Sequence, residues 1–128
     1  MTGSHDHQRE LVARIFDDLG RGHGTSLRQA SAPDVSWWLP LGSTEHRGIS
    51  DVENALVSIL GGKEAELQSV VLGADSRSAV VEQLLRGTEG VRTPATSVLT
   101  LRDGVVVSGR TYLDVAAWRG VAAEARRA

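Results

Sequence analysis

Residues 66–114 read ELQSVVLGADSRSAVVEQLLRGTEGVRTPATSVLTLRDGVVVSGRTYLD, and this stretch decides the fold class. It contains short runs rich in valine, leucine and threonine, which are typical of strands. The runs are Glu66–Leu72, Ser78–Arg86, Arg92–Leu101 and Val105–Asp114. Glycine and aspartate between the runs favour turns, above all the Asp-Gly pair at 103–104, which suits a tight hairpin. We therefore predict four consecutive antiparallel strands.

The N-terminal half has helical periodicity instead. Apolar residues at three- and four-residue spacing predict helices over Gln8–Leu19 and, more briefly, Thr25–Ala32. Ser50-Asp51-Val52-Glu53 matches the capping box, in which the serine and glutamate side chains satisfy exposed helix-end amides, and it opens a third helix that ends at Leu60. Val35–Leu41, which is β-branched and aromatic, predicts a strand before that helix. Helices followed by an antiparallel meander indicate an α+β fold, with a sheet that curls around three N-terminal helices.

One core is expected in a chain of 128 residues. We expect residues 1–8 to form a flexible polar tail, residues 9–118 to form the domain and residues 119–128 to form a C-terminal tail. Neither an apolar segment long enough to span a membrane nor a secretory signal is present, so we expect a cytoplasmic protein.

Composition excludes several function classes. The 14 basic and 16 acidic side chains leave no basic surface of the kind that binds nucleic acid. The absence of cysteine excludes a disulfide framework, a thiolate nucleophile and cysteine-ligated zinc. The histidines at positions 5, 7, 23 and 46 form no pair with metal-ligand spacing. We therefore expect no metal site and no bound cofactor, no nucleic-acid partner and no membrane partner.

The order of these elements, together with several short motifs, resembles the SnoaL-like branch of the nuclear-transport-factor-2-like superfamily over about residues 9–118. The motifs are the capping box, WWLPLGSTEHRG (37–48), VVEQLLRG (80–87), VLTLRDG (98–104) and GRTYLD (109–114). The resemblance implies a cone in which a curved sheet and three helices enclose a deep, largely apolar pocket. The superfamily holds isomerases, epoxide hydrolases, cyclases and proteins without catalysis, so the site must decide among them.

The resemblance also shows which family acids are missing. Ile15 and Leu39 stand where ketosteroid isomerases carry a catalytic tyrosine and aspartate, and Thr96 stands near the position of their second oxyanion donor. The Arg-x-Asp pair of the limonene-type epoxide hydrolases falls on Val81 and Gln83, and a further aspartate of that family falls on Thr111. A one-residue slip in the register of the strand 78–86 would turn Glu82 inward instead.

In the SnoaL-like cyclases an aspartate near the end of the last strand serves as the acid/base, and Asp114 is the matching residue. An aldol closure needs one group that takes a proton from an acidic carbon and returns a proton to the new alkoxide. The alternative is that Asp114 caps the turn at 115–118 by accepting backbone amides. His46, in a loop that the resemblance places at the pocket mouth, is a second acid/base candidate.

Trp37 and Trp38 are adjacent in a strand and must point to opposite faces, and we choose Trp38 for the pocket. In the last strand Gly109, Thr111 and Leu113 should look inward, whereas Arg110 and Tyr112 look outward to a homodimer interface. The full set of expected substrate-binding residues is Ile15, Phe16, Trp38, Leu39, Val81, Gln83, Thr96, Thr111 and Leu113.

These residues lead to one principal hypothesis and two alternatives. The first is a cofactor-independent enzyme that binds an apolar, ring-containing metabolite and catalyses its cyclisation or isomerisation in secondary metabolism, with Asp114 as acid/base. The second is an epoxide-opening hydrolase or cyclase that uses Glu82 or His46. The third is a ligand-binding or partner protein that kept the fold without the family acids.

Overall fold

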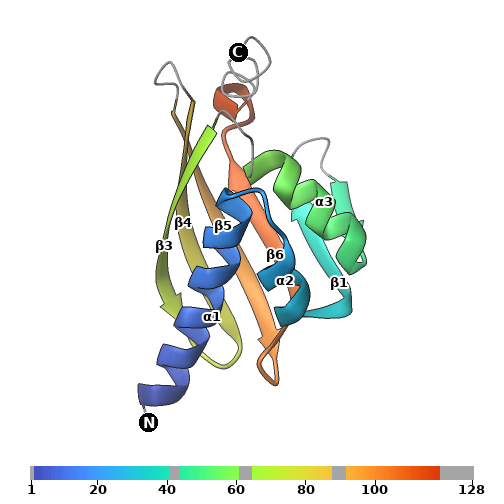
Figure 1. The fold of residues 1–128 in the computed structure, drawn as a ribbon, viewed down its shortest axis with the longest axis vertical. Coiled ribbons are helices and arrows are strands. Elements are labelled where there is room, and N and C mark those ends of the chain that lie inside the picture. The colour runs from blue at the N-terminus through green and yellow to red at the C-terminus, as the bar shows by residue number, and fades with distance from the viewer. Residues whose placement is uncertain (1, 41–43, 61–64, 88–91, 119–128) are drawn as a thin grey trace.

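The chain folds around one open, curved sheet of six strands in the order β2-β1-β6-β5-β4-β3 (Figure 1). The computed structural model describes residues 2–40, 44–60, 65–87 and 92–118. All neighbouring strands pair antiparallel except β1 and β6, which run parallel. In chain order the elements are α1 (Thr2–Gly20), α2 (Thr25–Ala30), β1 (Ser31–Leu39), β2 (Thr44–Arg47), α3 (Ile49–Leu60), β3 (Ala65–Ala74), β4 (Ser78–Gly87), β5 (Arg92–Arg102) and β6 (Val105–Leu113).

The predicted α+β class and the four-strand meander β3 to β6 are confirmed. The Asp-Gly pair forms the β5–β6 turn, with Asp103 at φ 53° and Gly104 at φ 78°. The sequence analysis missed β2, which we expected to be a loop, and it started β1 too late. Pro33 lies in β1 between Ser31 and Ser36, where the register with β6 shifts, so its missing N–H interrupts no regular ladder.

The helices are found where they were expected, with different ends. α1 begins at Thr2, so residues that we expected to form a flexible tail continue the helix. The predicted capping box is displaced: Gly48, at φ 87°, precedes α3 and its carbonyl accepts the amide of Val52. The Glu53 carboxylate instead accepts hydrogen bonds at both of its oxygens from the Arg28 guanidinium of α2. This hydrogen bond, and then the charge of Glu53, raise the pKa of Arg28 above its ordinary value.

All three labelled helices cover the same face of the sheet, which we call the inner face (Figure 1). The opposite, outer face of the sheet carries none of them. Between the helices and the inner face lies one apolar core, to which α1 contributes Val12, Ile15, Phe16 and Leu19 and α3 contributes Val52, Leu56 and Leu60. The strands add alternate residues, as the burial pattern of β5 shows from Thr93 to Leu101.

Trp37 is the largest fully buried side chain of the described chain, and Gly109 makes room for it. The two residues are partners in the parallel pairing of β1 with β6. A Cβ atom on Gly109 would lie 2.5 Å from Cε3 of the Trp37 indole, which is closer than real Cβ atoms approach. The indole therefore lies directly against the β6 backbone, and this contact holds one end of the polar chain described next.

Candidate functional site

A chain of hydrogen-bonded polar side chains crosses the inner face of the sheet inside the apolar core. Trp37 Nε1 donates to Thr111 Oγ1 at 2.9 Å. Thr111 Oγ1 lies 2.8 Å from Ser97 Oγ, and Ser97 Oγ donates to Gln83 Oε1 at 2.8 Å. These side chains come from β1, β6, β5 and β4 in spatial order, and each is at most 2% exposed. We call them the inner polar chain.

The donor at each step of the inner polar chain follows from the residue types. An indole nitrogen can only donate, so Thr111 accepts from Trp37. Ser97 uses its single hydroxyl hydrogen toward the Gln83 carbonyl oxygen, so the Thr111 hydroxyl must donate to Ser97. Every hydrogen bond then points the same way, toward Gln83. Aligned hydrogen bonds polarise one another, so the amide of Gln83 becomes a stronger donor.

The amide nitrogen of Gln83 has no hydrogen-bond partner among the described residues, although it is buried. The Thr93 hydroxyl on β5 is a second buried group without a partner in this part of the chain. Both face inward, and they are diagonal neighbours because Gln83 pairs with Ala95 and Thr93 with Leu85. An unsatisfied buried polar group costs about 1–3 kcal/mol, so two of them together mark a place where a ligand or an ordered water would lower the free energy.

Most of the expected substrate-binding residues do lie on the inner side. Ile15, Phe16, Leu39 and Val81 are buried in the apolar core, and Leu113 is half-buried at the end of β6. Gln83 and Thr111 both belong to the inner polar chain. The alternative register of β4 does not occur, because Glu82 is exposed while Val81 and Gln83 are buried.

Two expected pocket residues lie on the outer face instead. Trp38 packs its ring against Tyr112, with ring centroids 5.4 Å apart, while its neighbour Trp37 occupies the interior. Thr96 pairs with Glu82 and Tyr112, both of which are exposed. The side chains that face inward are those of the neighbouring residues Trp37 and Ser97, both of which are buried. The choice between adjacent tryptophans failed because alternation fixes that they oppose each other but not which one is buried.

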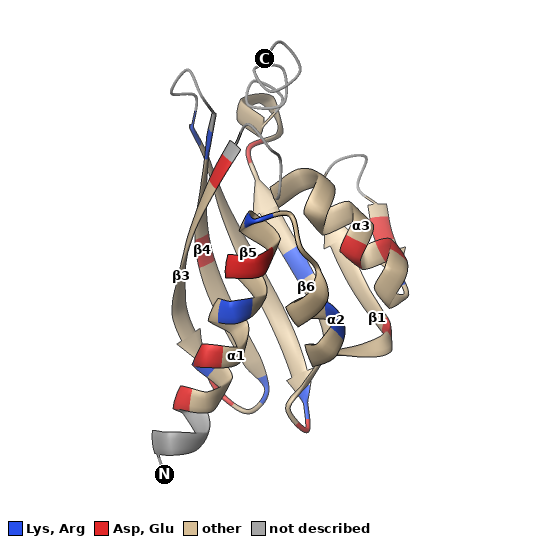
Figure 2. Cartoon of the chain, viewed as in Figure 1, with Lys and Arg blue, Asp and Glu red and all other residues tan. Residues whose placement is uncertain are grey.

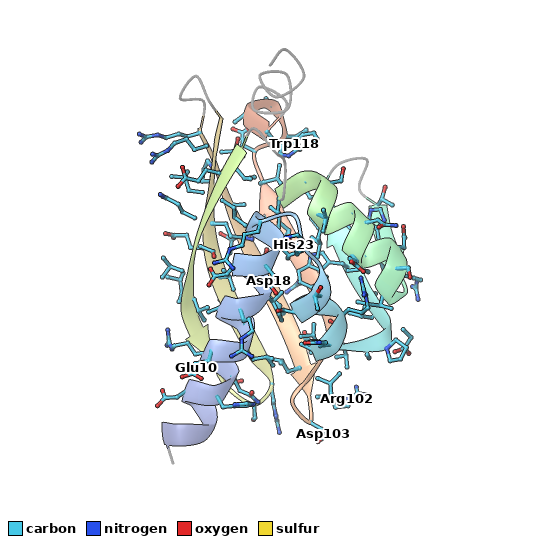
Figure 3. All side chains as sticks on the ribbon, in the orientation of Figure 1. Glu10, Asp18, His23, Arg102, Asp103 and Trp118 are labelled. Carbon is cyan, nitrogen blue, oxygen red and sulfur yellow. The ribbon has the colours of Figure 1, made fainter. Side chains whose placement is uncertain are left out.

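Asp114 follows β6 and is exposed. Its Oδ1 accepts the backbone amide of Ala117 at 3.1 Å, and its carbonyl oxygen accepts the amide of Trp118 at 2.9 Å. The structure thus has the capping arrangement that was the alternative to an acid/base role. The capped turn brings Trp118 close to α3, where its indole nitrogen donates to the carbonyl of Ile59 at 3.3 Å (Figure 3).

Capping predicts a specific response to substitution at Asp114. Asp114→Ala should lower the free energy of unfolding by roughly 0.5–2 kcal/mol, because the Ala117 amide loses its acceptor. Asp114→Asn should cost only a few tenths, since asparagine caps about as well as aspartate. Urea unfolding of both variants measures the difference. Equal losses in the two variants would show that the negative charge, and not the cap, is what the site needs.

His46 lies on the strand β2, where we expected a loop. Its Nδ1 is 3.1 Å from Asp51 Oδ2 at the start of α3, and the imidazole is 23% exposed. His46 is the register partner of Trp37, so both side chains stand on the inner side of their strands. The Asp51 carboxylate therefore fixes the orientation of the imidazole on this edge strand.

Sequence reasoning missed Trp37, Ser97 and Thr93 as site residues. Ser97 and Thr93 have the same parity along β5 as the apolar residues Leu99 and Leu101, so period-two spacing alone could have placed them inward. The described residues contain no group of His, Asp or Glu side chains that could hold a metal ion. None of the described helices is long and apolar enough to cross a membrane.

The fold is well represented among solved structures. A protein from Jannaschia sp. CCS1, assigned as a SnoaL-like polyketide cyclase, superposes with a TM-score of 0.76 at 19% identity over 92% of each chain. A protein from Kribbella flavida assigned as a ketosteroid isomerase gives 0.73 at 24% identity, over 87% of this chain and 80% of its own. Bal32a, from a soil-derived mobile gene cassette, gives 0.74 at 19% identity over 92% of this chain and 98% of its own.

Identities this low establish architecture and no activity. No protein-family model matches the sequence, and no curated protein matches it either. The helices on one face of a curved six-stranded sheet and the solved structures agree with each other and with the resemblance carried by the sequence motifs. The chain therefore has the fold of the nuclear-transport-factor-2-like superfamily.

Proposed function

We propose that the protein binds a small, largely apolar, ring-containing molecule on the inner face of its sheet. An acceptor oxygen of that molecule, such as a ketone, receives a hydrogen bond from the Gln83 amide nitrogen. The observation that carries the proposal is this buried amide, which has no partner in the part of the chain that the structure describes and stands at the end of an aligned hydrogen-bond chain. Apolar core residues such as Phe16 and Val81 favour a ligand with one polar atom in an otherwise hydrocarbon body.

The chemistry of the inner polar chain favours binding over acid–base catalysis. The buried polar side chains of the described residues are Ser26, Gln83, Thr93, Ser97 and Thr111, none of which titrates near neutral pH. A neutral donor can hold and polarise a carbonyl group, but it cannot remove a proton from carbon. Asp114, the expected acid/base, accepts a backbone amide at an exposed turn. Of the three hypotheses, ligand binding without the family acids has the most support.

The test uses pairs of ligands that differ in a single oxygen. Native mass spectrometry and thermal shift would compare steroid, aromatic polyketide and terpene ketones with their deoxy analogues, on the wild type, Gln83→Leu and Gln29→Leu. Gln29 is exposed on α2 and serves as the matched control. We expect the wild type and Gln29→Leu to prefer a ketone roughly tenfold, which corresponds to one hydrogen bond, and Gln83→Leu to lose that preference.

The same variant also separates a ligand-binding role from a structural one. Gln83→Leu removes the unsatisfied amide nitrogen, but it also removes the carbonyl oxygen that accepts the Ser97 hydroxyl, so the two effects on the unliganded protein oppose each other. If Gln83 is kept for a ligand, the variant should therefore unfold at a urea concentration close to that of the wild type. If Gln83 is kept for stability, the variant should unfold at lower urea concentration. Equal binding of a ketone and its deoxy analogue by the wild type would overturn the proposal.

A second candidate function has one observation in its favour, the His46–Asp51 contact at the edge of the inner face. We propose that a cofactor-independent cyclisation or isomerisation would use His46 as the proton acceptor. His46→Asn should then abolish turnover of any ketone that binds, while binding and the urea midpoint stay close to wild type. Turnover that survives in His46→Asn would leave the protein with the binding function alone.

A further inference from the structure

Two arginines stand side by side on the outer face of the sheet. Arg86 near the end of β4 and Arg92 at the start of β5 are register partners, and both point outward because their neighbours Leu85 and Thr93 are buried. Figure 2 shows basic residues at these ends of the two strands, at the top of the view. Directly opposite side chains have Cβ atoms about 4.5–5.5 Å apart, and like charges at that separation destabilise a sheet. An anion between the two guanidinium groups would remove this repulsion.

The Arg86 guanidinium also lacks an acceptor. Its Nε is buried and has no hydrogen-bond partner in the part of the chain that the structure describes. Glu66 of β3 is the register partner of Arg86 on its other side, yet no ion pair joins Glu66 to either arginine among the described residues. Arg28 shows the contrast, because its guanidinium donates to both oxygens of Glu53. An N–H of a cation that is removed from water without an acceptor is costly, so Arg86 favours an oxyanion beside it.

A groove of about 350 Å³ begins one row of residues away from the arginines. Its lining includes Gln68, Leu84 and Pro94, which are successive register partners across β3, β4 and β5. This row is two residues, or about 7 Å along the strands, from the row that holds Arg86 and Arg92. Leu84 and Pro94 give the groove an apolar surface, and sites for small molecules typically have volumes of roughly 300–1,000 Å³. The groove therefore offers an apolar binding surface next to a cationic pair.

The acidic residues around the groove limit which anion can bind. Glu82 is exposed at the end of the groove far from the arginines, and Glu66 flanks Arg86 on the side away from Arg92. A nucleic acid or another polyanion that crosses the face would meet one of these carboxylates, which repels it. A small molecule with a single anionic head can place that head between the arginines and keep its uncharged body in the groove. The surface therefore fits a small amphipathic anion.

A phosphate monoester matches the two guanidinium groups better than a carboxylate does. It carries about −1.5 to −2 charges at pH 7 and has three acceptor oxygens, whereas a carboxylate has one charge and two oxygens. Each guanidinium can donate two parallel hydrogen bonds to a phosphate group. We propose that the outer face binds a small phosphate monoester, with its phosphate between Arg86 and Arg92 and its apolar body over Leu84 and Pro94. This site lies on the opposite face of the sheet from Gln83 and is independent of the ligand proposed there.

Isothermal titration calorimetry of the full chain tests the site, with phenyl phosphate as the probe in phosphate-free buffer at fixed ionic strength. We expect Arg86→Gln and Arg92→Gln each to weaken binding by roughly tenfold or more, because hydrogen bonds between charged groups are lost. Arg14→Gln removes an exposed arginine of α1 and is the matched control, which should bind as the wild type does.

Two further comparisons test the two parts of the ligand. Benzoate, which has one charge, should bind the wild type roughly tenfold more weakly than phenyl phosphate. Leu84→Ser should weaken the binding of phenyl phosphate and leave that of inorganic phosphate unchanged, since this substitution alters only the apolar surface.

Each outcome bears on the proposal. A wild type that does not bind phenyl phosphate up to about 1 mM overturns the site. Binding that survives in both glutamine variants overturns its placement at Arg86 and Arg92, and equal affinities for benzoate and phenyl phosphate overturn the phosphate assignment. Urea unfolding without phosphate separates binding from structure. Arg92→Gln, at an exposed position, should unfold at the same or a higher urea concentration than the wild type, because the repulsion is relieved. A lower concentration would assign the arginine pair to the fold and overturn its binding role.

Discussion

Trp37→Ala is expected to lower the free energy of unfolding by about 3–5 kcal/mol, the usual cost of removing a large aromatic side chain from a core. The indole of Trp37 is fully buried, and its nitrogen donates the first hydrogen bond of the inner polar chain. Loss of the ring leaves a cavity, and it also leaves Thr111 without its donor. The same substitution at Trp38, on the outer face, should cost less than about 1.5 kcal/mol, because the ring is only half-buried and packs against the exposed Tyr112.

The comparison is a matched one, since the two residues are adjacent, identical in type and on the same strand. Urea unfolding at low micromolar protein measures both variants while limiting any contribution from association. Equal losses for the two variants, or a larger loss at Trp38, would contradict an orientation of β1 in which Trp37 faces the core and Trp38 the outer face.

The sequence predicted the parts of the fold that depend on local signals. The β3 to β6 meander follows from short β-branched runs and an Asp-Gly turn, and these strands were placed within a few residues of their observed ends. The missed strand β2 pairs only with β1 at the sheet edge. Its residues, Thr44–Arg47, are polar and carry no alternation that could mark a strand. Edge strands of this kind are specified by the neighbour they pair with, and that information is non-local.

Local sequence also could not predict which of the two adjacent tryptophans faces the core. Alternation requires that Trp37 and Trp38 point opposite ways, but the deciding residue is Gly109, which lies far along the chain and meets β1 only through the parallel pairing. The candidate site divides in the same way. Gln83 and Thr111 could be named from the family positions, and spacing could have placed Ser97 on the inner face, but the hydrogen bonds of Ser97 to both residues depend on the register of β4, β5 and β6.

Asp114 shows why residue type and position alone mislead about chemistry. Aspartate at the end of a strand fits an acid/base role and a cap equally well on paper. The backbone decides between them, because the chain turns at 115–118 and presents the Ala117 amide to the carboxylate. The inner polar chain consists of uncharged side chains, so it can act on a ligand by donating hydrogen bonds in a fixed direction. For this reason the proposed ligand is defined by an acceptor oxygen and not by an acidic proton.

Gly109→Ala is expected to destabilise the protein by about 1–3 kcal/mol through overpacking, because the added methyl group would occupy space held by the Trp37 ring. Gly73→Ala is the control: a Cβ on Gly73, also in a strand, would meet nothing within 4 Å, so this variant should be neutral or slightly stabilising. Urea unfolding of the two variants measures the difference. Similar losses at both positions would mean that backbone freedom, and not the contact with Trp37, explains the need for glycine.

A double-mutant cycle then assigns the cost of Gly109→Ala to its cause. In the Trp37→Ala background the indole is gone, so the added methyl group enters empty space, and Gly109→Ala should cost nothing or recover a few tenths of a kcal/mol. A coupling energy of about 1–3 kcal/mol between the two positions would establish that the glycine is kept for the tryptophan. Additive losses would show that the glycine is needed for a reason other than Trp37. They would also contradict the close contact between the indole and the β6 backbone.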